Sequence, residues 1–137
     1  MTERVSYLQP AHSIQEDRAR GLIYIKIEGF FDLATLKRHF RAETAVVDRW
    51  RAEHRPIRVL IDAVNLLPHS TECQAHIQRE TGTIYRAGDR VALHVSSSLV
   101  KMQMRRAFTQ GNTLNFFISN DAARMWLDAK PDEPMQG

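Results

Sequence analysis

The sequence predicts an α/β fold: a mixed sheet with antiparallel N-terminal strands, followed by repeated strand-helix units whose helices pack on the sheet. Three observations predict it. Residues 21–28 alternate in polarity as a strand does, and residues 57–63 and 90–95 are short apolar runs typical of strands buried on both faces. Longer segments with apolar residues at helical spacing follow these runs.

The N-terminal third reads as strands. Residues 3–8 and 12–16 are short β-like runs, and in residues 21–28 three isoleucines, Ile23, Ile25 and Ile27, fall on one face. The polar segment between the second and third runs, closed by Gly21, is typical of a hairpin loop. The sheet is therefore expected to begin with antiparallel pairing.

A first helix is predicted over residues 32–53, with Asp32 as its N-cap and Leu36 and Phe40 on its apolar stripe. Pro56 then prevents its continuation, and residues 57–63 form a strand. The polar side chains of the helix are expected on its solvent-facing side: Lys37, Arg38, Arg41, Glu43 and Asp48.

The remaining elements alternate. A helix over residues 70–86 should point Cys73, Ile77 and Ile84 inward, and a strand over 90–95 leads into a helix over 97–110. A strand over 114–118 and a helix over 120–129 complete the order. We expect a single domain over residues 1–129 and a flexible polar tail over 130–137.

Composition narrows the class of protein. The chain has 137 residues, of which 43% are hydrophobic, enough to build one core. The formal charge of +3, with both signs interspersed, argues against a nucleic-acid partner. The single cysteine fits a reducing compartment, and neither a signal peptide nor a membrane-spanning run is visible. The expectation is a cytoplasmic protein without a membrane span.

Four segments carry a family resemblance: RVLIDA at 58–63, RVALHV at 90–95, SSSLVKMQMRRAF at 96–108 and LNFFISNDAARMWLDA at 114–129. With the order of elements, they resemble the STAS domain, the fold of anti-sigma-factor antagonists and of the cytoplasmic tails of sulphate transporters. The sequence is most similar to the SpoIIAA-like branch of small bacterial proteins. The resemblance implies a STAS-type regulatory module that binds another protein.

The resemblance also implies a site. In the anti-sigma-factor antagonists an Asp-Ser-Ser-Gly motif follows the central strand, and its second serine is phosphorylated. When the strands are matched through Asp62, that serine falls on Thr71, and a shift of one residue places it on Ser70. The chain departs from the motif on both sides, with His69 or Pro68 in the acidic position and Glu72 or Thr71 in the glycine position.

Each hydroxyl has two interpretations. Ser70, Thr71 and Ser97 stand where helices begin, so they are N-caps, or they accept a phosphoryl group or contact a ligand. Asp62, at the end of its strand, orients a ligand, binds a metal, or bonds to the amides of the adjoining loop.

His69, Cys73 and His76 would lie along one face of a helix, and thiolate and imidazole are zinc ligands. A closed zinc site normally shows paired Cys or His motifs, which this sequence lacks. We therefore predict no metal and no cofactor, with Cys73 in the core and the two histidines as surface or capping groups. Recognised motifs of hydrolases, nucleotide-binding loops and zinc proteases are also absent, so a non-enzymatic protein is predicted.

The helix over residues 97–110 has a wide apolar face that includes Met102 and Met104. Three interpretations remain: core packing, a surface for a second copy of the chain, or one wall of a pocket whose other wall includes Leu36 and Phe40. Two functions follow, a protein-binding module and a carrier of a small hydrophobic, lipid-like ligand. A homodimer is predicted in addition.

Overall fold

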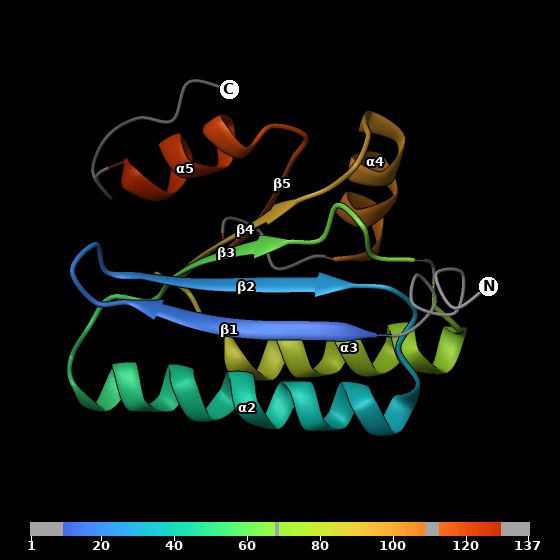
Figure 1. The fold of residues 1–137 in the computed structure, drawn as a ribbon. Coiled ribbons are helices and arrows are strands. Elements are labelled where there is room, and N and C mark those ends of the chain that lie inside the picture. Colours follow the sequence, from blue (N-terminus) through green and yellow to red (C-terminus); the bar gives the residue numbers. More distant parts are fainter. Residues whose placement is uncertain (1–9, 68, 109–112, 130–137) are drawn as a thin grey trace.

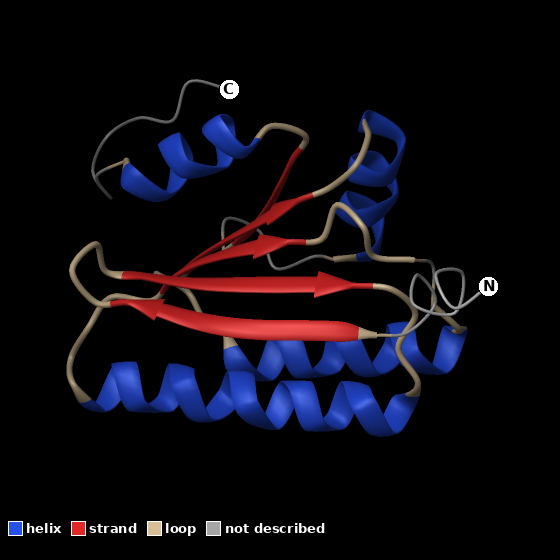
Figure 2. Cartoon of the chain, viewed as in Figure 1, coloured by secondary structure: helices blue, strands red, loops and turns tan. Residues whose placement is uncertain are grey.

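The computed structural model describes residues 10–67, 69–108 and 113–129, which form a sheet of five strands in the order β1-β2-β3-β4-β5 (Figures 1 and 2). The strands are β1 (Ala11–Asp17), β2 (Leu22–Glu28), β3 (Arg58–Asp62), β4 (Arg90–His94) and β5 (Leu114–Phe117). The expected strand over residues 3–8 and the expected tail over 130–137 lie outside the described residues.

The pairing of the strands confirms the predicted mixed sheet. β1 and β2 are antiparallel, with Asp17 opposite Leu22, and every later pair is parallel. Gly21 closes the hairpin with a φ of 67°, a left-handed conformation that glycine adopts without steric cost. Because the parallel strands need crossovers, a helix follows each of β2, β3 and β4.

The described helices are α2 (Leu33–Ala52), α3 (Thr71–Ile84), α4 (Ser98–Ala107) and α5 (Asn120–Asp128). α2 and α3 lie side by side on one face of the sheet, and α5 lies on the other (Figure 1). None of them is long and apolar enough to cross a bilayer. A polar side chain caps the start of each helix by accepting the N–H of the residue three positions later: Asp32, Ser70, Ser97 and Ser119.

The alternation of the central strands divides the core between the two faces of the sheet. Val59 and Ile61 of β3 pack with Val91 of β4 in a large cluster that includes Trp50 of α2. Leu60, between them in sequence, faces the other way and packs against Trp126 of α5. α4 contributes Val100, Met104 and Phe108 to the margin of the larger cluster.

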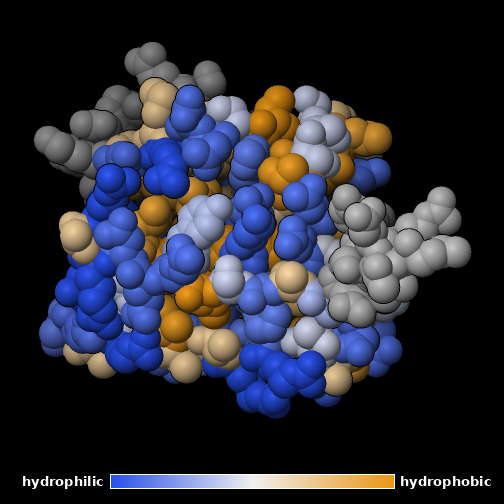
Figure 3. Space-filling view, viewed as in Figure 1, coloured by the Kyte–Doolittle hydropathy of each residue, from blue (hydrophilic) through white to orange (hydrophobic). Residues whose placement is uncertain are grey.

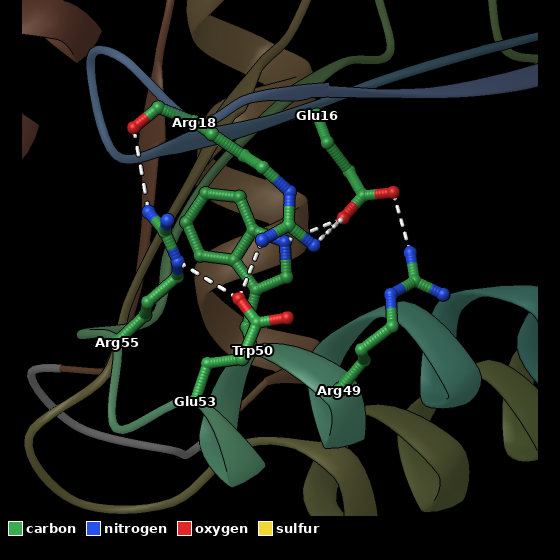
Figure 4. A network of polar contacts seen from close by, with 6 residues as sticks. All are labelled: Glu16, Arg18, Arg49, Trp50, Glu53 and Arg55. Carbon is green, nitrogen blue, oxygen red and sulfur yellow. Dashed lines mark hydrogen bonds and ion pairs between the residues drawn. The ribbon is translucent and has the colours of Figure 1, made fainter.

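A polar network fastens the β1–β2 hairpin to the end of α2 (Figure 4). The indole N–H of Trp50, a residue with no exposed surface, donates to Glu16 at 2.7 Å, and Arg49 reaches the other oxygen of Glu16 at 2.5 Å. Arg18 from the hairpin reaches Glu53 at 2.5 Å. Charge-assisted hydrogen bonds therefore hold the β1–β2 hairpin to the C-terminal end of α2.

One expectation about α2 is wrong. Glu43 was expected on the solvent-facing side of the helix, but only 3% of its surface is exposed. It stands four residues after buried His39 and four before buried Val47, so it belongs to the inward stripe of the helix. Its carboxylate is buried because it bonds to two other buried side chains, His39 and Tyr85.

Candidate functional site

The β3–α3 junction is held to the turn that follows β2. The N–H of Leu67 donates to the carbonyl of Gly29, and the N–H of Gly29 donates to the carbonyl of Asn65, both at 3.0 Å. Further along, the ring of His69 stacks on Phe30, with centroids 5.4 Å apart, and its Nε2 accepts the N–H of Phe31 at 3.1 Å. Partial burial lowers the pKa of His69, which favours the neutral ring that this acceptor role requires.

Ser70 and Thr71 lie on the surface at the start of α3, beyond the carboxyl end of β3. The Ser70 hydroxyl accepts the N–H of Cys73 at 3.2 Å, so this residue is the N-cap. Thr71 is the first helical residue, and Glu72 stands beside it in the first turn. Both hydroxyls are therefore accessible, and one of them also stabilises the helix.

Asp62 and Ser97 make the local bonds of loop and helix start. The Asp62 carboxylate accepts the N–H of Val64 at 3.2 Å and faces the hydroxyl of Tyr24 at 3.5 Å. Ser97 accepts the N–H of Val100 at 3.3 Å as the N-cap of α4. These bonds agree with the structural interpretation of each residue.

The three residues weighed as metal ligands have different environments. Cys73 is buried with its Sγ 3.7 Å from the carbonyl of Phe31, whereas His69 precedes the helix and stacks on Phe30. Across the ranges that the structure describes, no group of three or more His, Cys, Asp or Glu side chains is placed to hold a metal ion.

His76 was expected to be a surface or capping group, and that expectation is wrong because the residue is buried within α3. Only 5% of His76 is exposed, because its ring turns toward α2 and meets the ring of Phe40 edge to face, with centroids 5.7 Å apart. The packing of α3 against α2 thus buries a residue whose sequence neighbours Ala75 and Gln74 are exposed.

A cavity of about 430 Å³ lies between the helices α2, α3 and α4 and the face of the sheet that carries the larger core cluster. Of the residues predicted to enclose an apolar ligand, Leu36, Phe40 and Met104 line this cavity. Met102 does not line it and is 54% exposed. Most of the other lining side chains are apolar: Ile27, Phe31, Ile61, Ala63, Leu66, Leu67, Ile77, Val91, Leu93, Val100, Phe108 and Leu114.

A buried polar chain borders the same cavity. His39 Nε2 lies 2.8 Å from one carboxylate oxygen of Glu43, and the hydroxyl of Tyr85 donates to the other at 2.6 Å. Nδ1 of His39 lies 3.1 Å from Nδ1 of His12 on β1, which extends the chain toward the surface. Burial, with the neighbouring Glu43 carboxylate, raises the pKa of Tyr85 well above its usual value of 10.0, so its phenol stays protonated.

Sequence reasoning missed this polar chain. His39 and Glu43 are spaced by four residues, and His39 follows Leu36 by three, which places both on the stripe that carries the apolar residues. That spacing was a usable signal for their burial. Their contact with Tyr85 was not visible, because it joins positions separated by 42 residues.

No protein-family model and no curated protein matches the sequence. Solved structures do match. An anti-sigma factor antagonist from Mycobacterium paratuberculosis superposes with a TM-score of 0.60 at 12% identity, covering 88% of this chain and 96% of the other. An uncharacterized protein with a SpoIIAA-like fold from Shewanella loihica gives a TM-score of 0.64 at 19% identity, covering 87% and 95%.

These matches, with the order of strands and helices, establish that the chain has a SpoIIAA-like fold. They confirm the fold that the sequence resemblance implied.

Proposed function

We propose that this chain is a non-enzymatic, STAS-type regulatory module of the bacterial cytoplasm that binds a protein partner around the β3–α3 junction. One observation carries the proposal: Ser70 and Thr71 are exposed at the start of α3, beyond the carboxyl end of a central parallel strand. In open α/β sheets this edge is the usual place for ligands and partners. The anti-sigma factor antagonist with the same fold supports a protein partner.

Phosphorylation of Ser70 or Thr71 is the proposed switch. A phosphoryl group adds between one and two negative charges, and the start of a helix favours negative charge. The exposed Glu72 carboxylate, beside Thr71, opposes that effect. A phosphoryl group here would therefore alter the charge of the partner-binding surface more than the stability of the helix.

Phosphosite mapping of the protein isolated from its host, or after incubation with a cognate kinase, tests the switch. We expect modification at Ser70 or Thr71. Thr71→Glu is expected to change the affinity for a partner protein isolated from the host by about tenfold. Each 1.4 kcal/mol of binding free energy changes Kd by that factor.

The matched control is Thr83→Glu, an exposed threonine near the other end of α3. It should leave partner affinity unchanged. Unmodified Ser70 and Thr71, together with equal affinities for the two glutamate variants, would contradict the switch.

The cavity favours a second candidate function, the binding of a small hydrophobic molecule. Its volume of about 430 Å³ falls in the range of small-molecule sites, and most of its lining is apolar. Mass spectrometry of the freshly purified protein under native conditions should show a retained adduct. A protein of bare sequence mass that also binds no added amphiphile would contradict a carrier.

A further inference from the structure

We propose that the cavity binds an uncharged aliphatic alcohol, whose chain packs on the sheet and whose hydroxyl donates a hydrogen bond to Glu43. This inference rests on the second candidate function, the binding of a hydrophobic molecule, and names the chemistry of that molecule. It does not depend on the phosphorylation switch at α3.

The polar wall of the cavity has spare acceptors. Glu43 is 3% exposed, and its two carboxylate oxygens receive one donor each, from His39 at 2.8 Å and from Tyr85 at 2.6 Å. A carboxylate offers about four lone-pair sites, so it can accept another donor. Tyr85 gives its only proton to Glu43, which leaves its oxygen an acceptor as well.

The buried donors in the same wall are already occupied. Nε2 of His39 bonds to Glu43, and its Nδ1 faces Nδ1 of His12 at 3.1 Å, so neither ring nitrogen is left to donate to a ligand. This holds whichever of the two histidines carries the shared proton. The Thr81 hydroxyl, also on the cavity, donates to the carbonyl of Ile77 at 2.6 Å.

The cavity wall therefore has more free hydrogen-bond acceptors than free buried donors, which favours a ligand whose head group donates a hydrogen bond. A ligand O–H satisfies the spare acceptors, and in a low-dielectric cavity such a bond to a carboxylate is stronger than in water. A carboxylate or phosphate head group would bring a second negative charge against Glu43 without a buried donor to receive it. An ether of the same chain would leave the acceptors unsatisfied.

The rest of the cavity suits a hydrocarbon chain. Its apolar lining includes Ile61 and Leu93 from the sheet, Phe40 of α2 and Met104 of α4. The exposed residues Gln74 of α3, Ser96 before α4 and Gln103 of α4 also line the cavity, so it reaches solvent beside them. An alcohol that enters there would place its hydroxyl at the buried end, beside Glu43.

Three probes with one chain length test the proposal by calorimetry on the full chain: decanol, decyl methyl ether and decanoate. We expect decanol to bind tightest, by roughly tenfold or more over each of the others, the effect of one hydrogen bond to a charged group. Decanoate binding as tightly as decanol would overturn the proposal, because its carboxylate would then be held by the glutamine amides at the mouth.

Variants test whether Glu43 is the source of the preference for an alcohol over an ether. Glu43→Gln should lower the alcohol-to-ether ratio of affinities, because a neutral amide oxygen is a weaker acceptor than a carboxylate. Asp128→Asn, the same exchange of a carboxylate for an amide at an exposed residue of α5 outside the cavity lining, should keep the ratio of the unmodified protein. Tyr85→Phe removes a donor from Glu43 and leaves its carboxylate in place, so the alcohol should remain preferred. An unchanged ratio in Glu43→Gln would overturn the assignment of that carboxylate.

Circular dichroism and thermal unfolding show which variants fold. If Glu43→Gln does not fold, the three probes on the unmodified protein and on Tyr85→Phe still decide the outcome. Failure of all three probes to bind would remove the carrier function itself. Equal binding of all three would overturn only the preference for an alcohol.

Discussion

At the scale of single residues, Glu16 and Glu43 show how a hydrogen-bond partner decides the environment of a carboxylate. Glu43 lies in the core because His39 and Tyr85 satisfy its oxygens. Glu16 lies on the outer strand β1, where the buried indole N–H of Trp50 reaches it from below (Figure 4). This hydrogen bond, with Arg49 and Arg18 nearby, lowers the pKa of Glu16 below its ordinary value of 4.5.

Glu16→Gln should lower the free energy of unfolding by about 1 kcal/mol at neutral pH, the scale of one hydrogen bond in a partly exposed site. Because the pKa of Glu16 is lowered in the folded state, its contribution is complete above 4.5 and is lost as the pH falls through the folded value. The difference between variant and parent should therefore vanish on acidification. Urea unfolding at several pH values measures it.

The control for this prediction is Asp128→Asn, which changes an exposed carboxylate at the end of α5. It removes a negative charge from a helix C-terminus, so it should not lower the free energy of unfolding. A pH-independent loss in Glu16→Gln would show that the charge of Glu16 is not the source of its contribution.

At the scale of elements, the residues that begin the helices stabilise them, and one of these residues also exposes a hydroxyl that could be modified. Each described helix begins at an Asp or Ser that accepts a backbone N–H, and the Ser70 cap is also a candidate phosphoacceptor. A capping hydroxyl is explained by helix stability alone. The capping role and the switch therefore need separate tests.

Ser70→Ala should reduce the free energy of unfolding by about 1 kcal/mol, since the first turn of α3 loses its acceptor for the Cys73 N–H. Ser70→Asp should restore it, because aspartate is an equally good cap and carries a charge that the helix dipole favours. Chemical denaturation of the unmodified protein, Ser70→Ala and Ser70→Asp measures both effects. If Ser70→Asp restores stability but changes partner binding, the cap and the switch are separate properties of one residue.

At the scale of the whole molecule, hydrophobic surface remains exposed over α4 and the turn that follows β5 (Figure 3). The exposed apolar side chains there are Leu99 at 64%, Met102 at 54% and Ile118 at 50%. Such surface is often covered by a partner, and a second copy of the chain is the partner we predicted.

Light scattering at micromolar concentration should therefore give twice the monomer mass of 15.8 kDa. Met102→Glu should shift the protein toward the monomer without changing its fold, because it places a charge in the contact. Met125→Glu is the matched control, since Met125 is 73% exposed and lies on α5, which packs in the smaller core cluster and not in the one that α4 joins. A monomer mass for the unmodified protein would contradict the dimer.

The sequence by itself determined the alternation of strands and helices, the candidate caps Asp32, Ser70 and Ser97, and the shared face of Ile23 and Ile25 on β2. These features depend on local spacing: a period of two residues in strands, a period of about 3.6 residues in helices, and hydroxyls or carboxylates where helices begin. For the elements that the structure describes, the predicted bounds lie within three residues of the observed ones, and the largest difference is at the end of α4, predicted over 97–110 and observed as Ser98–Ala107. Helix ends are where such patterns are least sharp.

Only the tertiary structure decided where Glu43, His76 and Met102 lie and whether a cavity exists. Glu43 is buried by a bond to Tyr85, 42 residues away, and His76 by the packing of α3 on α2. The cavity is the space left between a sheet and three helices. Periodicity tells which face of an element is apolar, but the distance between two elements follows from how all their side chains pack together.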